Sequence, residues 1–576
     1  GDAAFFALGG LSVSPDHRLL AYTTDTEGGE RFTLRFRDLE SGTTLPEVIE
    51  DTYYGLAWAN DSATVFYTRP DLASRPYQLW RHRVGTAPSD DRCVHTEEDE
   101  RFFVRVHKTK DDAAVIVSLE AAVTTEVRVV DADDPLGEPR VLEARRQGIE
   151  YEVEHRGGQF LIVTNDGAEN FRLMVAPDRR SGRAHWRQVL PYDPEVRLEG
   201  IEVFARHLVL VERAEGYRRI RVANLDAEGI PLASTLRVLD QPEAVGTAWL
   251  GANLEADTTV LRYGYTSLIT PRSVYEHDMA TGRTVLRKRQ PILGGYDPAT
   301  YRTERRWART EDGEAVPISL VHRADVDPDG TAACLVYGYG SYEVSVDPVF
   351  SSLRLSLLDR GVVVAIAHVR GGGELGRRWY REGALATKHH TFTDFIACAR
   401  HLVAEGWAAP DRLVARGASA GGLLMGVVAN QAPGLFAAII AEVPFVDCLT
   451  TLMDPSLPLT VTEWEEWGNP VADPAAYRTI KAYSPYDNVG SHPYPRILAT
   501  AGLNDARVAY WEPAKWVQKL RACAPDATVL LRTELGAGHQ GPSGRYDAWR
   551  DEAVITAFIL DAMGLANAGA ALEGSG

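Results

Sequence analysis

The chain has 576 residues, of which 45% are hydrophobic and 24% are charged, a composition that excludes a disordered or fibrous protein. Its formal net charge of -19 makes nucleic acid and anionic membranes poor partners and favours cationic ligands. No apolar run approaches the roughly 18 to 20 residues of a membrane span. The five scattered cysteines form no CxxC pair, so we expect neither a disulfide framework nor a zinc site, and a cytoplasmic location.

The first half of the chain repeats a turn followed by a short run of β-forming residues. The turns fall at residues 16, 61, 111, 157, 206 and 256, and the steps between them are 45, 50, 46, 49 and 50 residues. Several strands per copy at such a period are typical of β-propeller blades. A pair of β-sandwiches with accidental spacing is the alternative. Because six copies are visible, we expect either six blades or a propeller whose first blade lies outside this sequence.

This pattern breaks at the Pro- and Gly-rich stretch 290–298, which we interpret as the connection between a propeller domain, 1–295, and a second domain, 296–576. Beyond it, apolar runs that resemble buried strands alternate with helical segments. The strand-like runs are 333–337, 362–367, 412–415, 496–500 and 528–531. Such alternation predicts a doubly wound, mostly parallel sheet covered by helices, the α/β class.

One segment carries the signature of a nucleophile. Gly417-Ala418-Ser419-Ala420-Gly421 matches G-x-S-x-G and stands between a predicted strand and a predicted helix, which is the context that the motif requires. The glycines permit a sharp turn that presents Ser419 Oγ at the sheet edge, where the next backbone N–H can bind an oxyanion. A closely packed glycine turn without a catalytic role is the alternative.

A catalytic serine needs a base, and the base needs an orienting acid. In folds of this type the order along the chain is Ser, Asp, His, each in a loop after a strand. Asp505 follows the run 496–500, and His539 follows the run 528–531. We therefore expect His539 to take the Ser419 proton and Asp505 to hold the imidazole tautomer. A helix N-cap role for Asp505 and an ordinary loop position for His539 are the alternatives.

Two further patterns do not predict cofactors. The stretch 371–376 fits G-x-G-x-x-G, but charged residues flank its glycines and no nucleotide-binding βαβ repeat surrounds it. No H-E-x-x-H occurs, and the adjacent His389 and His390 cannot share one helical face. We expect no cofactor and no catalytic metal.

Taken together, these features resemble the prolyl oligopeptidase family of serine peptidases, and most closely its oligopeptidase B branch. The resemblance rests on the segments 336–342, 354–361, 368–376, 463–470 and 510–516, and it extends weakly back to residue 1. It implies an α/β-hydrolase domain and a seven-bladed propeller that covers the active site. Members usually carry about a hundred further residues before this point, so it also implies that a first blade is missing here.

The resemblance implies further roles around the triad. The Tyr339 hydroxyl would join the Ala420 backbone N–H in the oxyanion hole, and Arg507 would bind a substrate backbone carbonyl. A buried core position for Tyr339 and a salt bridge for Arg507 are the alternatives. Two donors preset at the oxyanion position contribute on the order of several kcal/mol to catalysis.

Specificity would come from acidic residues in the substrate pocket. Glu463 and Glu465 match the positions that select Arg or Lys before the cleaved bond, and Tyr342 matches an aromatic pocket wall. Asp347 matches one of two acids that favour a second basic residue upstream, but the other position is Val349, so we do not rely on a dibasic preference. Solvent-facing glutamates in an acidic protein are the alternative.

The sequence therefore predicts a cytoplasmic serine oligopeptidase, a monomer or small homo-oligomer, that hydrolyses short basic peptides after Arg or Lys through an acyl-enzyme. A prolyl oligopeptidase, acylaminoacyl peptidase or esterase of the same fold is one alternative, and a non-enzymatic interaction protein is another. Glu463 argues against proline selectivity, which needs an apolar pocket. The order of Ser419, Asp505 and His539 argues against an inert domain.

Overall fold

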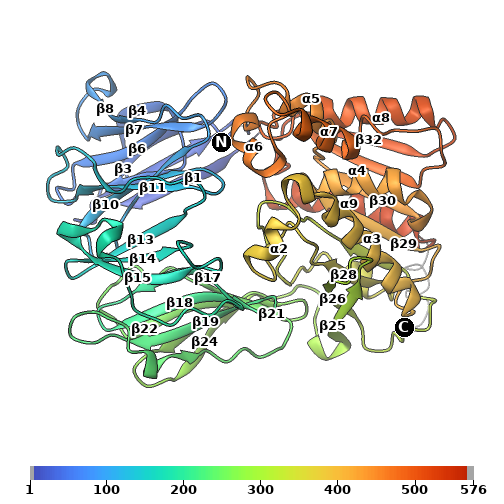
Figure 1. Ribbon diagram of the computed structural model, residues 1–576, viewed down its shortest axis with the longest axis horizontal. Coiled ribbons are helices and arrows are strands. Elements are labelled where there is room, and N and C mark those ends of the chain that lie inside the picture. The colour runs from blue at the N-terminus through green and yellow to red at the C-terminus, as the bar shows by residue number, and fades with distance from the viewer. Residues whose placement is uncertain (1–4, 567–576) are drawn as a thin grey trace.

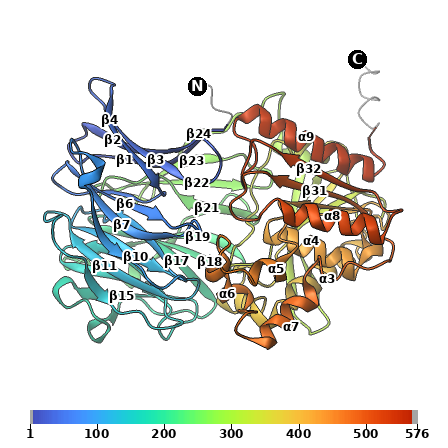
Figure 2. The same ribbon diagram turned by 90° about the horizontal axis from the view of Figure 1, so that it is seen from above.

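The computed structural model describes residues 5–566, and its two parts lie side by side (Figure 1). The first part consists of six four-stranded sheets, each made of four consecutive strands. These sheets correspond to the six predicted repeats, and they form a β-propeller (blue to green in Figure 1; seen from above in Figure 2). The second part contains one eight-stranded sheet flanked by helices.

The strands of the first three blades are β1 (Ala7–Val13), β2 (Leu19–Asp25), β3 (Phe32–Asp38) and β4 (Thr44–Thr52); β5 (Leu56–Trp58), β6 (Thr64–Pro70), β7 (Pro76–Arg83) and β8 (Arg92–Thr96); and β9 (Phe103–Lys108), β10 (Ala114–Glu120), β11 (Thr125–Asp131) and β12 (Arg140–Glu143). Those of the last three are β13 (Tyr151–Arg156), β14 (Gln159–Thr164), β15 (Arg172–Pro177) and β16 (Arg187–Gln188); β17 (Val196–Val203), β18 (His207–Ala214), β19 (Tyr217–Asn224) and β20 (Arg237–Val238); and β21 (Gly246–Leu250), β22 (Val260–Ser267), β23 (Ser273–Asp278) and β24 (Thr284–Arg289).

The repeat in the sequence has a local cause in the turns. The side chains of Asp16, Asp61 and Asp111 each accept the backbone N–H two residues further on, at 3.0 to 3.2 Å. An aspartate in this position closes a tight turn, and each one lies between the first and the second strand of its blade. In β3, the buried Phe32, Leu34 and Phe36 alternate with polar residues, as expected for a strand with packed side chains on one face.

The eight-stranded sheet has the order β25-β26-β28-β27-β29-β30-β31-β32. The pairs from β28 through β32 are parallel, whereas β25 and β26 are antiparallel to each other and β26 is antiparallel to β28. The strands are β25 (Tyr301–Arg309), β26 (Ala315–Arg323), β27 (Cys334–Tyr337), β28 (Val363–Ala367), β29 (Leu413–Ala418), β30 (Ala438–Glu442), β31 (Arg496–Gly502) and β32 (Val529–Glu534). This is the predicted mostly parallel α/β arrangement, that of an α/β-hydrolase. The antiparallel pair and β30 are not among the predicted strands.

Helices cover both faces of this sheet. They are α1 (Leu355–Leu358), α2 (Arg377–Arg381), α3 (His389–Ala404), α4 (Ala420–Gln431), α5 (Cys448–Leu452), α6 (Thr460–Trp467), α7 (Pro474–Tyr483), α8 (Trp511–Cys523) and α9 (Arg545–Ala562). Neighbouring residues of one strand point to opposite faces. Ala415 accordingly packs in the core that contains α3, α4 and α8, whereas Val414 packs in the core that contains α1 and α9.

The last blade ends at Arg289 and the sheet of the second part begins at Tyr301. The predicted break near residue 295 lies between them, and we propose it as the domain boundary. Ion pairs cross the face where the two parts meet: Glu30 with Arg507, Arg101 with Glu465, Glu150 with Arg377, Glu169 with Arg381, Arg197 with Glu343, and Arg213 with Asp347. Within residues 5–566 no helix is both long and apolar enough to cross a membrane.

Candidate active site

Ser419 occupies a sharp turn between β29 and α4, with φ 58° and ψ -118°. A residue with a side chain in this left-handed region is strained and persists only where its surroundings hold it. A Cβ on Gly417 would lie 2.4 Å from the Gly421 carbonyl oxygen, and a Cβ on Gly421 would lie 2.7 Å from that of Gly338. Both glycines are therefore required by close packing, and the turn presents the hydroxyl of Ser419 to a pocket.

Asp505 and His539 come together in the loops that follow β31 and β32. The Asp505 carboxylate is buried, and its Oδ2 lies 2.7 Å from His539 Nδ1. Its other oxygen accepts the backbone N–H groups of Arg507 at 2.8 Å and Val508 at 2.9 Å. A carboxylate fixed in this way holds the proton of the imidazole on Nδ1 and leaves Nε2 as the basic atom.

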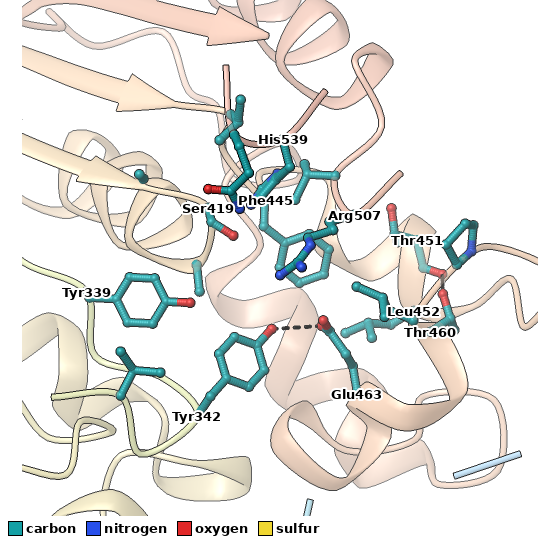
Figure 3. A pocket seen from close by; sticks show the side chains of 18 residues that line it. Tyr339, Tyr342, Ser419, Phe445, Thr451, Leu452, Thr460, Glu463, Arg507 and His539 are labelled. Atoms are coloured by element: carbon teal, nitrogen blue, oxygen red, sulfur yellow. Dashed lines mark hydrogen bonds between the residues drawn. The ribbon is translucent and has the colours of Figure 1, made fainter. Parts of the chain in front are cut away.

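Ser419 and His539 line one pocket of about 510 Å³, together with Tyr339 and Ala420 (Figure 3). No hydrogen bond joins Ser419 Oγ to His539 among the residues that the structure describes, although the two side chains lie in the same pocket. Hydrogen bonds of this kind are often long or poorly aligned before a substrate binds and tighten in the complex. The pocket therefore brings Ser419 and His539 together, and Asp505 is joined to them through its contact with His539 Nδ1.

The two predicted oxyanion donors also lie at this pocket. Ala420 is the first residue of α4, where backbone N–H groups have no partner within the helix. The Tyr339 hydroxyl points into the pocket on the side of Ser419 (Figure 3). Burial, followed by the nearby Glu463 carboxylate, raises the pKa of Tyr339 above its usual value, so the phenol keeps the proton that it would donate.

An acidic group lies at the other end of the pocket. Glu463 extends from α6, and its Oε2 accepts hydrogen bonds from the Tyr342 hydroxyl at 2.9 Å and from Trp467 Nε1 at 2.8 Å (Figure 3). The rings of Tyr342 and Trp467 meet edge to face, 5.7 Å apart. Burial raises the pKa of Glu463 to about 7, against the effect of these two donors. The pocket thus has a serine at one end and an ionisable, aromatic-walled recess at the other.

Two residues predicted to bind substrate lie elsewhere. Glu465 is on α6 only two positions after Glu463, and residues two apart on a helix do not share a face. Its Oε1 accepts bonds from the propeller residues Gln147 at 3.0 Å and Arg101 at 3.5 Å. Asp347 is paired with Arg213 of the propeller at 2.8 Å. Neither Glu465 nor Asp347 lines the pocket that contains Ser419, so both take part in contacts between the two parts of the chain.

Arg507 lines the pocket but is also held by the propeller. Its guanidinium makes a two-point ion pair with Glu30, at 2.7 and 3.0 Å. Glu30 belongs to the loop between β2 and β3, and Asn504 donates to the Glu27 carbonyl of the same loop. This loop therefore contacts the segment that carries Asp505. The sequence contains no signal for Glu30, because it is separated from Arg507 by 477 residues.

Comparison with known proteins agrees with this arrangement. The chain matches the N-terminal β-propeller domain of prolyl oligopeptidase over residues 1–290 and the prolyl oligopeptidase family over residues 348–566. It is 42% identical over 569 residues to dipeptidyl aminopeptidase BI of Pseudoxanthomonas mexicana, covering 98% of this chain and 77% of that protein.

Two solved structures are also similar at 36% identity. Oligopeptidase B from Leishmania major has a TM-score of 0.94, with 98% of this chain and 80% of that one covered. Oligopeptidase B from Trypanosoma brucei, in a closed form with covalently bound antipain, has a TM-score of 0.93, with 97% and 79% covered. A propeller joined to a serine hydrolase domain defines the class. The chain belongs to the prolyl oligopeptidase family and is a serine peptidase.

Proposed function

We propose that this peptidase cleaves short peptides on the carboxyl side of Arg or Lys, with Ser419, His539 and Asp505 as its catalytic triad. The observation that carries the proposal is the Glu463 carboxylate, which faces the same pocket as Ser419. A guanidinium or ammonium group that enters this recess gains a charge-assisted hydrogen bond. A neutral side chain would leave the carboxylate desolvated and unpaired, which costs binding free energy.

In the proposed reaction, Ser419 Oγ attacks the scissile carbonyl carbon and its proton passes to His539 Nε2. The negative charge that develops on the carbonyl oxygen is stabilised by the Tyr339 hydroxyl and the Ala420 N–H. The imidazolium then gives its proton to the leaving amine, the C–N bond breaks, and an acyl-enzyme remains. Water, deprotonated by His539, attacks the ester, releases the peptide acid and restores the Ser419 hydroxyl.

The propeller accounts for the proposed restriction to short peptides. Its first blade contacts the segment that carries Asp505 through Glu27 and Glu30. The connections that follow its second and third blades contact α6 through Arg101 and Gln147. A folded protein could not reach a serine covered in this way, whereas a flexible peptide could enter after a movement of the parts. All five cysteines are free thiols, which supports a reducing cytoplasmic location.

A second candidate activity follows from one relative. The Pseudoxanthomonas mexicana protein is named a dipeptidyl aminopeptidase, which indicates release of dipeptides from a free N-terminus. Such an enzyme needs a group that binds the substrate ammonium two residues before the cleaved bond. The two candidates predict different responses to a blocked N-terminus.

The test is a matched panel of chromogenic peptides with Arg, Lys, Pro or Ala before the cleaved bond, each with a free and an acylated N-terminus. The proposal expects fast cleavage after Arg and Lys in both forms and little cleavage after Pro. Cleavage only of the substrates with a free N-terminus would favour the dipeptidyl activity. Equal rates for Arg and Pro peptides would contradict the role of Glu463.

The raised pKa of Glu463 predicts a pH-dependent selectivity. Below about pH 7 the Glu463 carboxyl group is mostly protonated and neutral, and above about pH 7 it is mostly anionic. Its attraction for a cationic side chain therefore increases as the pH rises. We expect the ratio of kcat/KM for an Arg peptide to kcat/KM for the matched Ala peptide to increase between about pH 6 and pH 8. The chemical steps at Ser419 are common to both peptides, so their dependence on pH cancels in this ratio.

The Glu463→Gln variant is the control for this measurement, because its amide does not titrate and its ratio should not change with pH. A ratio that stays constant in the unsubstituted protein over the same range would show that Glu463 does not contact the substrate cation.

A further inference from the structure

Two buried charged side chains lie outside the pocket and hold the segment that carries Tyr339 and Tyr342. Lys388 directly precedes α3, and Glu466 is in the last turn of α6. The side chains of both are only 1% exposed, and neither lines the pocket that contains Ser419. Taking a charge out of water is costly, so the contacts of this pair must compensate for that cost.

The segment that they hold has an unusual backbone. Gly340, Tyr342 and Glu343 have φ values of 77°, 59° and 58°, all in the left-handed region. A Cβ at Gly340 would lie 2.4 Å from the methyl carbon of Thr391, so only glycine fits there. Residues with side chains persist in this conformation only where the surrounding structure holds them. The position of the Tyr339 hydroxyl therefore depends on what restrains the four residues that follow it.

The restraint comes from two different helical regions. Lys388 Nζ donates to the Gly340 carbonyl at 2.5 Å and to Ser341 Oγ at 2.7 Å. Glu466 Oε1 accepts the Tyr342 N–H at 3.1 Å and lies 3.8 Å from Lys388 Nζ. The other Glu466 oxygen accepts the Tyr380 hydroxyl at 2.8 Å. The backbone is thus bound on both sides of Ser341, directly between the predicted oxyanion donor and the pocket wall.

The two charges depend on each other. Burial lowers the pKa of Lys388 to about 8, and the nearby Glu466 opposes that shift. Burial likewise raises the pKa of Glu466, and Lys388 is the first group that opposes this shift. Loss of one charge would leave the other uncompensated, which is more damaging than loss of both.

We propose that Lys388 and Glu466 are positioning residues for catalysis, which hold the Tyr339 hydroxyl where the oxyanion forms. The proposal rests on the function proposed above, because it needs Tyr339 to act as a donor. A donor contributes most when its position is set before the reaction, since no reorganisation is then needed as charge develops. Neither residue lines the pocket that contains Ser419, so we expect their effect to fall on kcat rather than on binding.

The test is a double-mutant cycle between Lys388→Met and Tyr339→Phe, measured with an Arg peptide. Removal of one oxyanion donor, as in Tyr339→Phe, is expected to lower kcat about 100-fold or more. Lys388→Met alone should lower kcat about 10- to 100-fold and change KM less than about threefold, because it misplaces the same donor. In the Tyr339→Phe background the further loss should be less than about threefold, since the donor is already absent.

Lys110→Met is the matched control, because Lys110 is a largely buried propeller lysine paired with Glu202 at 2.6 Å. It should leave kcat unchanged. If Lys388→Met does not fold, the double variant Lys388→Met/Glu466→Gln replaces it in the cycle, because it leaves no unpaired buried charge and keeps an acceptor for the Tyr342 N–H.

The outcomes separate the two proposals. An equal fractional loss of kcat in both backgrounds would show a merely structural role and overturn the positioning proposal while the peptidase function stands. A kcat of Lys388→Met, or of the double variant, within about twofold of that of the unsubstituted protein would overturn it as well. Absence of cleavage after Arg or Lys in the unsubstituted protein would instead contradict the proposed function itself.

Discussion

Ser419→Ala is expected to lower kcat on Arg and Lys peptides by about five to six orders of magnitude, as loss of the nucleophile does in other serine peptidases. The substituted side chain removes one oxygen atom and adds no bulk in the strained turn after β29. Binding of a peptide product should change little, because Glu463 and Arg507 are unaffected. Steady-state kinetics measure the loss of kcat, and a fluorophosphonate, which requires the serine oxygen, should no longer label the variant. Calorimetric titration measures binding of the product.

His539→Ala in the Ser419→Ala background serves as the control. The two residues act in one step, so the second substitution should cause almost no further loss. A Ser419→Ala variant that kept more than about 1% of the original kcat would show that another residue is the nucleophile. If His539→Ala lowered kcat by the same factor in the Ser419→Ala variant as in the unsubstituted protein, His539 would not act through Ser419.

Glu463→Gln is expected to lower kcat/KM for an Arg peptide about 100- to 1000-fold, since it removes one member of a buried charge pair formed with the substrate. The amide has the shape of the carboxylate and can still accept the bonds from Tyr342 and Trp467, so the pocket should keep its form. Cleavage of the matched Ala peptide should stay the same or increase, because no desolvated carboxylate then opposes a neutral side chain.

Glu465→Gln is the matched control, because it makes the same change two positions later on the same helix. Its partners are Arg101 and Gln147 of the propeller, so the preference for Arg over Ala should not change. If Glu465→Gln lowered the preference as much as Glu463→Gln, the assignment of Glu463 as the specificity residue would be wrong. Measurement of kcat/KM for both peptides with both variants decides this.

Glu463 and Glu465 also show why the sequence alone could not distinguish a residue in the pocket from a residue at the propeller. A motif match assigns a role to each position separately, and Glu463 and Glu465 both match. On a helix the two side chains point about 200° apart. Because α6 lies between the pocket and the propeller, Glu463 faces the pocket and Glu465 contacts the propeller. Asp347 has the same explanation, because its partner Arg213 is 134 residues away in a propeller strand.

Patterns with a local cause could be predicted from the sequence. The spacing of the six turns predicts six blades, and at Asp16, Asp61 and Asp111 the turn is closed by its own neighbours. The alternation of apolar strands with helices predicts a mostly parallel sheet. The Ser419 turn is similarly local, since Gly417 and Gly421 are needed within the same few residues. The order of Asp505 and His539 follows from the rule that loops after parallel strands meet at one edge.

Only the tertiary structure decided which distant groups meet. The pairing of Glu30 with Arg507, of Arg213 with Asp347, and of Lys388 with Glu466 joins segments from about 80 to nearly 500 residues apart. No periodicity or motif records such contacts, because they depend on how complete blades, helices and loops pack against one another. The sequence by itself therefore determined the class of fold and contained the local motif from which Ser419 is predicted as the nucleophile. The packing determined which charges face the pocket and which hold its walls.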